Sequence, residues 1–186
     1  PACGCLFQGR MWLGGFLDKP MTMYGSKSGL IEDFTQGANA GDGIELTVDS
    51  NAQDLIQALV PGKDLYILTT AGEYRLTGGD EGITPRKFRI EQQSAIGADN
   101  VEPIRVENST LFVARGGRRV LEWIYSMQYD ALSGEDISEL AADLFEDGIA
   151  QIVYQPSAVV SYGADPVGIL WVRTAAGAVR ALTHDR

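Results

Sequence analysis

The sequence is poor in the side chains that most enzymes use for chemistry. Among 186 residues it holds one histidine, His184, and two cysteines, Cys3 and Cys5. A structural zinc site would lack ligands, because such sites take four Cys or His side chains. A Gly-x-Ser-x-Gly nucleophile elbow and a Gly-Lys-Ser/Thr phosphate loop are also absent. The motifs therefore predict no catalytic residues, no cofactor and no metal site, although counting alone does not exclude the paired carboxylates of glycosidases.

The two cysteines are separated by one residue in a strand-like segment. Side chains at i and i+2 of a strand point to the same face about 7 Å apart, which does not suit a relaxed disulfide. We therefore expect both thiols to be reduced and buried, as is usual for a protein made in a cytoplasm.

Basic residues are scarce as well. The chain has 15 Lys and Arg against 25 Asp and Glu, a formal charge of −10. A nucleic-acid binder needs a basic surface to displace counterions from phosphate. The composition thus argues against a specific nucleic-acid partner.

Long apolar runs are missing too: none approaches the roughly 18 residues that cross a bilayer. No signal-type segment opens the chain, which starts at Pro1 and stops at Arg186 shortly after a strand-like run. We expect residues 1–186 to form a single region that is truncated at both ends from a longer protein, with no membrane partner.

The sequence does contain one hairpin pattern that occurs three times. Two apolar strands flank a Gly-containing turn in residues 65–77, 111–125 and 169–182. A repeat of roughly 40–50 residues indicates a propeller made of small sheets. Further short strands are predicted around Gly9, at 21–24, 44–48, 87–91, 101–106, 149–154 and 158–162, and residues 26–43 read as a long loop. Residues 51–60 are ambiguous between a strand and a single helical turn.

One helix interrupts this pattern. Asp136 can cap its start with Glu139 three residues later, and an apolar stripe runs from Ile137 to Phe145. Gly148 is placed to end the helix in a left-handed conformation. The predicted fold is all-β, a partial β-propeller of about three to four antiparallel blades with one inserted α-helix at about 136–147.

The order of these motifs resembles the β-propeller tail hub, or nozzle, proteins of short-tailed bacteriophages and prophages. It is carried by Arg10-Met11-Trp12-Leu13-Gly14-Gly15, Tyr24-Gly25-Ser26-Lys27-Ser28-Gly29, Leu59-Val60-Pro61-Gly62, Leu76-Thr77-Gly78-Gly79, Pro103-Ile104-Arg105-Val106, Gly117-Arg118-Arg119-Val120 and Leu170-Trp171-Val172-Arg173. Two features depart from that family: the helix ends in Leu144-Phe145-Glu146-Asp147-Gly148 where a His-Leu pair is expected, and the chain stops soon after Leu182.

The resemblance implies a virion structural protein without enzymatic activity. Such a protein joins portal-side and distal tail parts by contacts with its own copies and with other tail or portal proteins. It would be located in the virion tail, assembled in the bacterial host cytoplasm, with DNA passing through the assembled channel. A carbohydrate-binding or glycoside-hydrolysing propeller is the alternative, and a bacterial protein-interaction propeller is a third reading.

Three arginines form the only dense basic spot. Arg115, Arg118 and Arg119 flank Gly116-Gly117 in the second hairpin turn. Glycine supplies positive φ there, and the arginines can simply keep the tip solvated. The functional reading is contact with channel DNA or with an acidic neighbouring subunit.

The tryptophans and the acidic loops are predicted to have structural roles. Trp12, Trp123 and Trp171 lie in apolar strand patterns and are expected in the core between sheets. Asp80-Glu81 and 134–136 lack the ligand spacing of a calcium loop.

Overall fold

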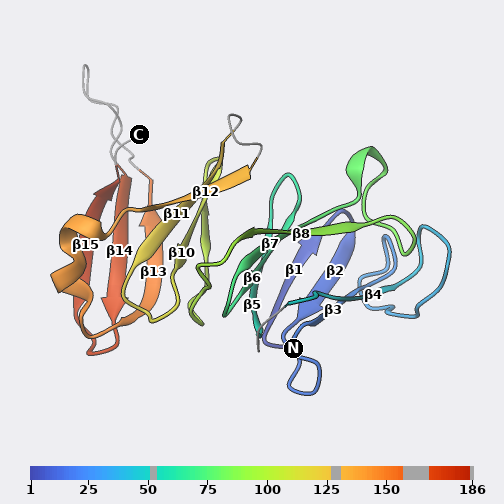
Figure 1. Cartoon of the computed structure of the whole chain (residues 1–186), viewed down its shortest axis with the longest axis horizontal. Coiled ribbons are helices and arrows are strands. Elements are labelled where there is room, and N and C mark those ends of the chain that lie inside the picture. Colours follow the sequence, from blue (N-terminus) through green and yellow to red (C-terminus); the bar gives the residue numbers. More distant parts are fainter. Residues whose placement is uncertain (51–53, 127–130, 157–167, 185–186) are drawn as a thin grey trace. The chain divides into compact units, whose positions relative to one another are not determined.

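The computed structural model describes residues 1–50, 54–126, 131–156 and 168–184 (Figure 1). The all-β prediction is confirmed: strands dominate, and they form four antiparallel sheets. In each sheet the strands follow one another in chain order, so every sheet is a simple meander. Contacts divide the chain into two compact units, Pro1–Ala98 and Asp99–Arg186, each with two sheets.

The first unit holds two four-stranded sheets. They comprise β1 (Cys3–Phe7), β2 (Arg10–Gly14), β3 (Thr22–Gly25) and β4 (Ile44–Thr47), followed by β5 (Ile56–Pro61), β6 (Leu65–Thr69), β7 (Glu73–Thr77) and β8 (Arg89–Ser94). The ambiguous segment is thus strand β5 where the structure describes it, and the loop before β8 contains a short 3-10 turn, η1 (Gly79–Glu81). The β1–β2 hairpin turns at Gln8 and Gly9, both with positive φ, as a two-residue turn between twisted strands requires.

One apolar core joins the two sheets of this unit. Trp12 and Met23 from the first sheet and Ile56, Leu65 and Ile67 from the second are all at most 1% exposed. On β6 the core residues Leu65 and Ile67 alternate with Tyr66 and Leu68, which belong to the other face of the strand and are buried as well. Cys3 and Cys5 share that face, as predicted, but they are half-buried free thiols.

Trp12 packs flat on a glycine of the neighbouring strand. A Cβ at Gly25 would lie 3.0 Å from the Trp12 ring. The Gly25→Ala change should therefore lower the free energy of unfolding by about 1–3 kcal/mol, because the buried ring must shift. Chemical denaturation followed by circular dichroism measures this. Gly41→Ala, where a Cβ meets nothing within 4 Å, is the matched control; equal losses for the two changes would contradict the packing argument.

The second unit is built in the same way. It comprises β9 (Ile104–Val106), β10 (Ser109–Val113), β11 (Val120–Ser126) and β12 (Ala131–Asp136), then β13 (Ile149–Gln155), β14 (Gly168–Thr174) and β15 (Val179–His184). Its core takes Leu111 and Val113 from one sheet and Leu170 and Val172 from the other, all 0% exposed. All three predicted hairpins are confirmed, as β6–β7, β10–β11 and β14–β15. The strand predicted at 158–162 lies outside the described residues.

The inserted helix differs from its prediction. It is a kinked 3-10 helix, η2 (Glu139–Phe145), and not an α-helix over 136–147. Asp136 does not cap it, because it ends β12 and its carboxylate accepts hydrogen bonds from Ser138 N and Oγ at 2.9 and 2.7 Å. Phe145 is the buried anchor, and Ile137 and Ala141 pack partly buried against the same core, whereas Leu140 is fully exposed, so only part of the predicted apolar stripe faces the core. Gly148 does adopt positive φ, as expected.

The three tryptophans differ in burial. Trp12 and Trp123 are buried, and the Trp123 ring meets Phe112 edge to face with centroids 6.2 Å apart. Trp171 is 39% exposed, so its core assignment was wrong. It lies on the face of β14 opposite Leu170 and Val172, and its Nε1 donates to Gln155 Oε1 at 2.9 Å.

Candidate contact surfaces

The arginine turn (residues 115–119) is a rigid hairpin tip. Ala114 N donates to Arg119 O at 2.9 Å and Gly117 N donates to Ala114 O at 3.0 Å. Gly116 and Gly117 both have positive φ, which confirms the role predicted for them. The guanidinium of Arg119 lies 3.8 Å from the Asp136 carboxylate.

All three arginines of the turn are exposed. Arg115 and Arg118 form no salt bridge with any residue that the structure describes. The turn therefore carries two exposed cations without a salt bridge to the described residues, and they favour an anionic partner.

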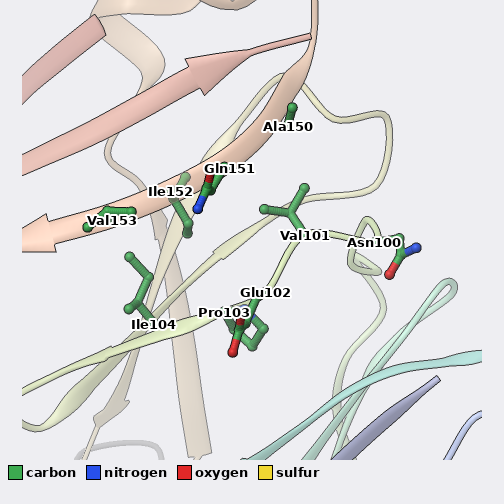
Figure 2. Close-up of a pocket in the computed structure, with 9 residues that line it drawn as sticks. All are labelled: Asn100, Val101, Glu102, Pro103, Ile104, Ala150, Gln151, Ile152 and Val153. Atoms are coloured by element: carbon green, nitrogen blue, oxygen red, sulfur yellow. The ribbon is translucent and has the colours of Figure 1, made fainter. Parts of the chain in front are cut away.

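A hollow of about 460 Å³ lies in the same unit (Figure 2). Its walls are the segment leading into β9 and the first half of β13: Asn100, Val101, Glu102, Pro103, Ile104, Ala150, Gln151, Ile152 and Val153. We call it the β13 cavity. Aliphatic side chains from both walls face each other across it, and the polar side chains of Gln151 and Glu102 also line it. Such a mixture suits an apolar side chain together with polar backbone.

The arginine turn and the β13 cavity are neighbours. Ile149, next to the lining residue Ala150, donates its N–H to Gly117 O at 2.6 Å. Asp99, next to the lining residue Asn100, lies 3.1 Å from the position of a Cβ on Gly117. Both walls of the cavity thus begin at the arginine turn, so a hollow of mixed polar and apolar lining ends beside the turn that carries Arg115 and Arg118.

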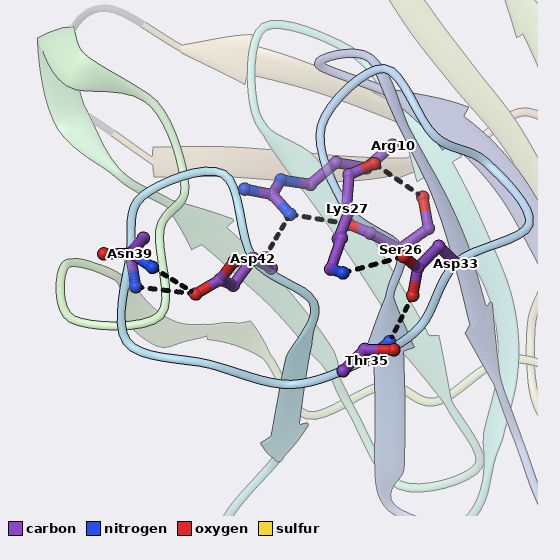
Figure 3. Close-up of polar contacts among 7 residues, drawn as sticks. All are labelled: Arg10, Ser26, Lys27, Asp33, Thr35, Asn39 and Asp42. Carbon is purple, nitrogen blue, oxygen red and sulfur yellow. Dashed lines mark hydrogen bonds and ion pairs between the residues drawn. The ribbon is translucent and has the colours of Figure 1, made fainter.

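In the first unit, the long loop of residues 26–43 is held by one buried cation (Figure 3). Arg10 is 3% exposed, and its guanidinium donates to the carbonyls of Ser26, Asp42 and Ala40 at 2.6, 2.7 and 2.5 Å. These three carbonyls belong to both ends of the loop. Burial lowers the pKa of Arg10, and the Asp42 carboxylate acts in the opposite direction. We call residues 26–43 the anchored loop.

Polar contacts within the anchored loop fix its shape. Lys27 Nζ lies 2.7 Å from Asp33 Oδ2, and Asp33 Oδ1 accepts from Thr35 N at 2.9 Å. The Lys27 ammonium holds the pKa of the Asp33 carboxyl well below its usual range. Asp42 accepts from both nitrogens of Asn39 at 2.9 Å. The loop is therefore an ordered element despite its lack of strand or helix.

The loop presents two aliphatic residues to solvent. Leu30 is 58% and Ile31 46% exposed, and Glu32 follows them, also exposed. The turn beneath is closed by Leu30 N donating to Lys27 O and Asp33 N donating to Leu30 O, each at 3.1 Å. Leu30, Ile31 and Glu32 are called the tip. An ordered loop that exposes aliphatic side chains is a candidate protein-contact element.

Two buried carboxylates lie at the β6–β7 hairpin. Asp54 accepts from Thr69 Oγ1 and Thr70 Oγ1 at 2.7 and 2.8 Å and from Ala71 N at 3.0 Å. Glu73 is 0% exposed, and Ser94 Oγ donates to it. Burial raises the pKa of Glu73, while the Ser94 hydroxyl and the nearby backbone amides lower it. Both groups serve the local fold.

Glu73 should make stability depend on pH. Its folded pKa lies above the ordinary value of 4.5, so its contribution is most favourable below that value and is lost as pH rises through the raised pKa. We therefore expect the difference in free energy of unfolding between Glu73→Gln and the native protein to shift in favour of the variant as the pH rises from roughly 4 to 7. Urea titrations at both pH values measure this, with exposed Glu146→Gln as control. A difference that stays constant with pH would contradict the burial argument.

The remaining candidates show no clustering. Among the residues that the structure describes, no three His, Cys, Asp or Glu side chains lie close enough to hold a metal ion. Burial raises the pKa of Cys3 to about 11 and that of Cys5 to about 12, so neither is a ready nucleophile. The side chain of His184 lies outside the described residues. No described helix is long and apolar enough to cross a membrane.

Sequence reasoning found the arginine turn and the loop of residues 26–43, but it missed the Arg10 anchor, the exposed aliphatic tip of the loop and the β13 cavity. A signal for the tip did exist, because Leu30-Ile31 is an apolar pair inside a stretch rich in Gly, Asn and Asp. Nothing local marks the cavity, since its two walls come from segments far apart in the chain.

Comparison with protein-family models gives no match for this chain, and comparison with curated protein sequences gives none.

Proposed function

We propose that the chain is a structural component of a bacteriophage tail hub, or nozzle. The observation that carries the proposal is the succession of antiparallel meanders, in which the hairpin recurs as β6–β7, β10–β11 and β14–β15. Meanders in chain order, each covering the face of another, are the units of a β-propeller. The motif order that resembles the nozzle family lies on these same strands and turns.

The role is assembly and not catalysis. The chain joins portal-side and distal tail parts through contacts with its own copies and with other tail proteins, in the virion tail assembled in the host cytoplasm. Three carboxylates with structural partners support this proposal: the buried Asp54 and Glu73 accept hydrogen bonds from Thr69 and Ser94, and the partly buried Asp136 accepts one from Ser138. The formal charge of −10 suits a surface along which DNA passes without being bound.

The mass and the shape of the protein in solution test the proposal. Light scattering and negative-stain microscopy should show a closed ring of subunits. A monomer that forms no ring with portal or tail proteins would contradict it.

A carbohydrate-binding propeller is the second candidate, and exposed Trp171 favours it. The indole is fixed by its bond to Gln155, and Arg173 Nε donates to Gln151 Oε1 at 3.4 Å on the same sheet face. Such a face can stack on a sugar ring and offer polar groups at its edge. Binding on a glycan array that disappears in Trp171→Ala would support this candidate, and an empty array would reject it.

A further inference from the structure

We propose that the tip of one copy of this chain docks in the β13 cavity of a second copy, with the acidic end of the tip against the arginine turn. The inference deepens the proposed structural function, since it names the surfaces through which copies meet. The elements come from different units, the tip from the first and the cavity from the second.

The cavity requires a particular kind of occupant. At about 460 Å³ it falls within the range of roughly 300–1,000 Å³ typical of ligand pockets. Val101, Ile104 and Ile152 give it apolar walls, so one or two aliphatic side chains would lose water on entering. Arg115 and Arg118 in the turn beside it form no salt bridge with the described residues, so the occupant should also be anionic.

The tip combines both properties in consecutive residues. Leu30 and Ile31 supply the aliphatic groups, and Glu32 beside them supplies an exposed carboxylate that forms no salt bridge with the described residues. The Lys27–Asp33 pair and the Arg10 anchor fix the backbone beneath, so little conformational entropy is lost on docking.

Charge sets the direction of docking. Glu102 lines the cavity, whereas Arg115 and Arg118 belong to the turn whose Gly117 lies beside Asp99 and Ile149, where the two walls begin. Glu32 is repelled by Glu102 and attracted by Arg115 and Arg118, so the tip enters in one orientation. The two surfaces differ from each other, so the contact is head-to-tail, and repetition closes a ring or extends a filament.

A charge exchange between the two surfaces tests the contact. Sedimentation equilibrium of the 186-residue chain at low ionic strength should show self-association. Arg118→Glu and Glu32→Arg should each weaken it about tenfold or more, and the combined variant should recover affinity to within about threefold of the native chain. Arg180→Glu, the same charge change at an exposed position of β15, is the matched control and should leave association unchanged.

Ile31→Ser provides an uncharged test at a position that is 46% exposed. It should weaken association about tenfold as well, since the aliphatic side chain would no longer fill the cavity. A chain that stays monomeric, or single variants whose defects the combination does not repair, would overturn the proposal. Rings of full-length protein that survive both single charge reversals would reject this contact and leave the tail-hub function standing.

Discussion

Trp123→Ala is expected to lower the free energy of unfolding of the second unit by about 3–5 kcal/mol. Trp123 is 2% exposed in β11, and Phe112 packs against its ring edge to face. Removing the indole deletes a large buried apolar surface and leaves a cavity that close-packed strands cannot fill. Denaturation followed by far-ultraviolet circular dichroism measures the loss without relying on tryptophan fluorescence.

Trp171→Ala is the matched control, because it makes the same chemical change in the same unit. Trp171 is 39% exposed, so a change well below that of Trp123→Ala is expected, about 1 kcal/mol or less. Equal losses for the two variants would show that the second face of β14 is covered in solution. A change near zero for Trp123→Ala would contradict its burial.

Arg10→Met should cost about 3–5 kcal/mol of stability in the first unit. The methionine keeps the aliphatic bulk but removes donors from the carbonyls of Ser26, Ala40 and Asp42. Each buried carbonyl left unpaired costs about 1–3 kcal/mol, unless the loop opens to let water reach it. Either response should loosen the anchored loop, so limited proteolysis should cut within residues 26–43 much faster than in the native chain.

Arg89→Met is the control for this prediction. Arg89 is 76% exposed and pairs with Glu91 on the surface, where an ion pair contributes about 0–1 kcal/mol. Its replacement should leave both stability and the cleavage pattern nearly unchanged. An anchored loop that resists protease equally in Arg10→Met would show that the internal contacts of Lys27 and Asp33 suffice to hold it.

The loop result also bears on assembly. If the tip docks as proposed, Arg10→Met should weaken self-association although every tip side chain is retained. The loosened loop would have to become ordered on binding, and this costs conformational entropy. The loop would thus link a buried cation beneath the sheet to a contact at the surface.

Local chemistry was enough to predict the repeated hairpins. Alternating apolar residues on either side of Ala71-Gly72, of Gly116-Gly117 and of Ala176-Gly177 favour two strands and a tight turn whatever surrounds them. The same alternation placed Cys3 and Cys5 on one face and Trp12 in the core. These features depend on neighbours a few residues apart, so one sequence is sufficient to find them.

The helix shows where local patterns fail. Asp136, Glu139 and the apolar spacing after Ile137 describe a good helix start, yet β12 pairs with β11 as far as Asp136 and takes the cap residue into the sheet. Only the turns from Glu139 remain, and Phe145 alone is buried. Pairing of β12 with the preceding strand β11 overrode a helical preference of a few residues.

Local sequence patterns were sufficient to predict the strands, the turns, the all-β class and the arginine turn with Arg115, Arg118 and Arg119. Tertiary packing was needed to show that Trp171, unlike Trp123, is exposed, that Arg10 anchors a loop, and that residues near 101 and 151 enclose a cavity. The difference lies in the distance along the chain over which each feature is set. The conformation of a turn depends on its own few residues, whereas the burial of a side chain depends on which other segments fold over it. Strands with the same alternation of apolar and polar residues can therefore differ in burial.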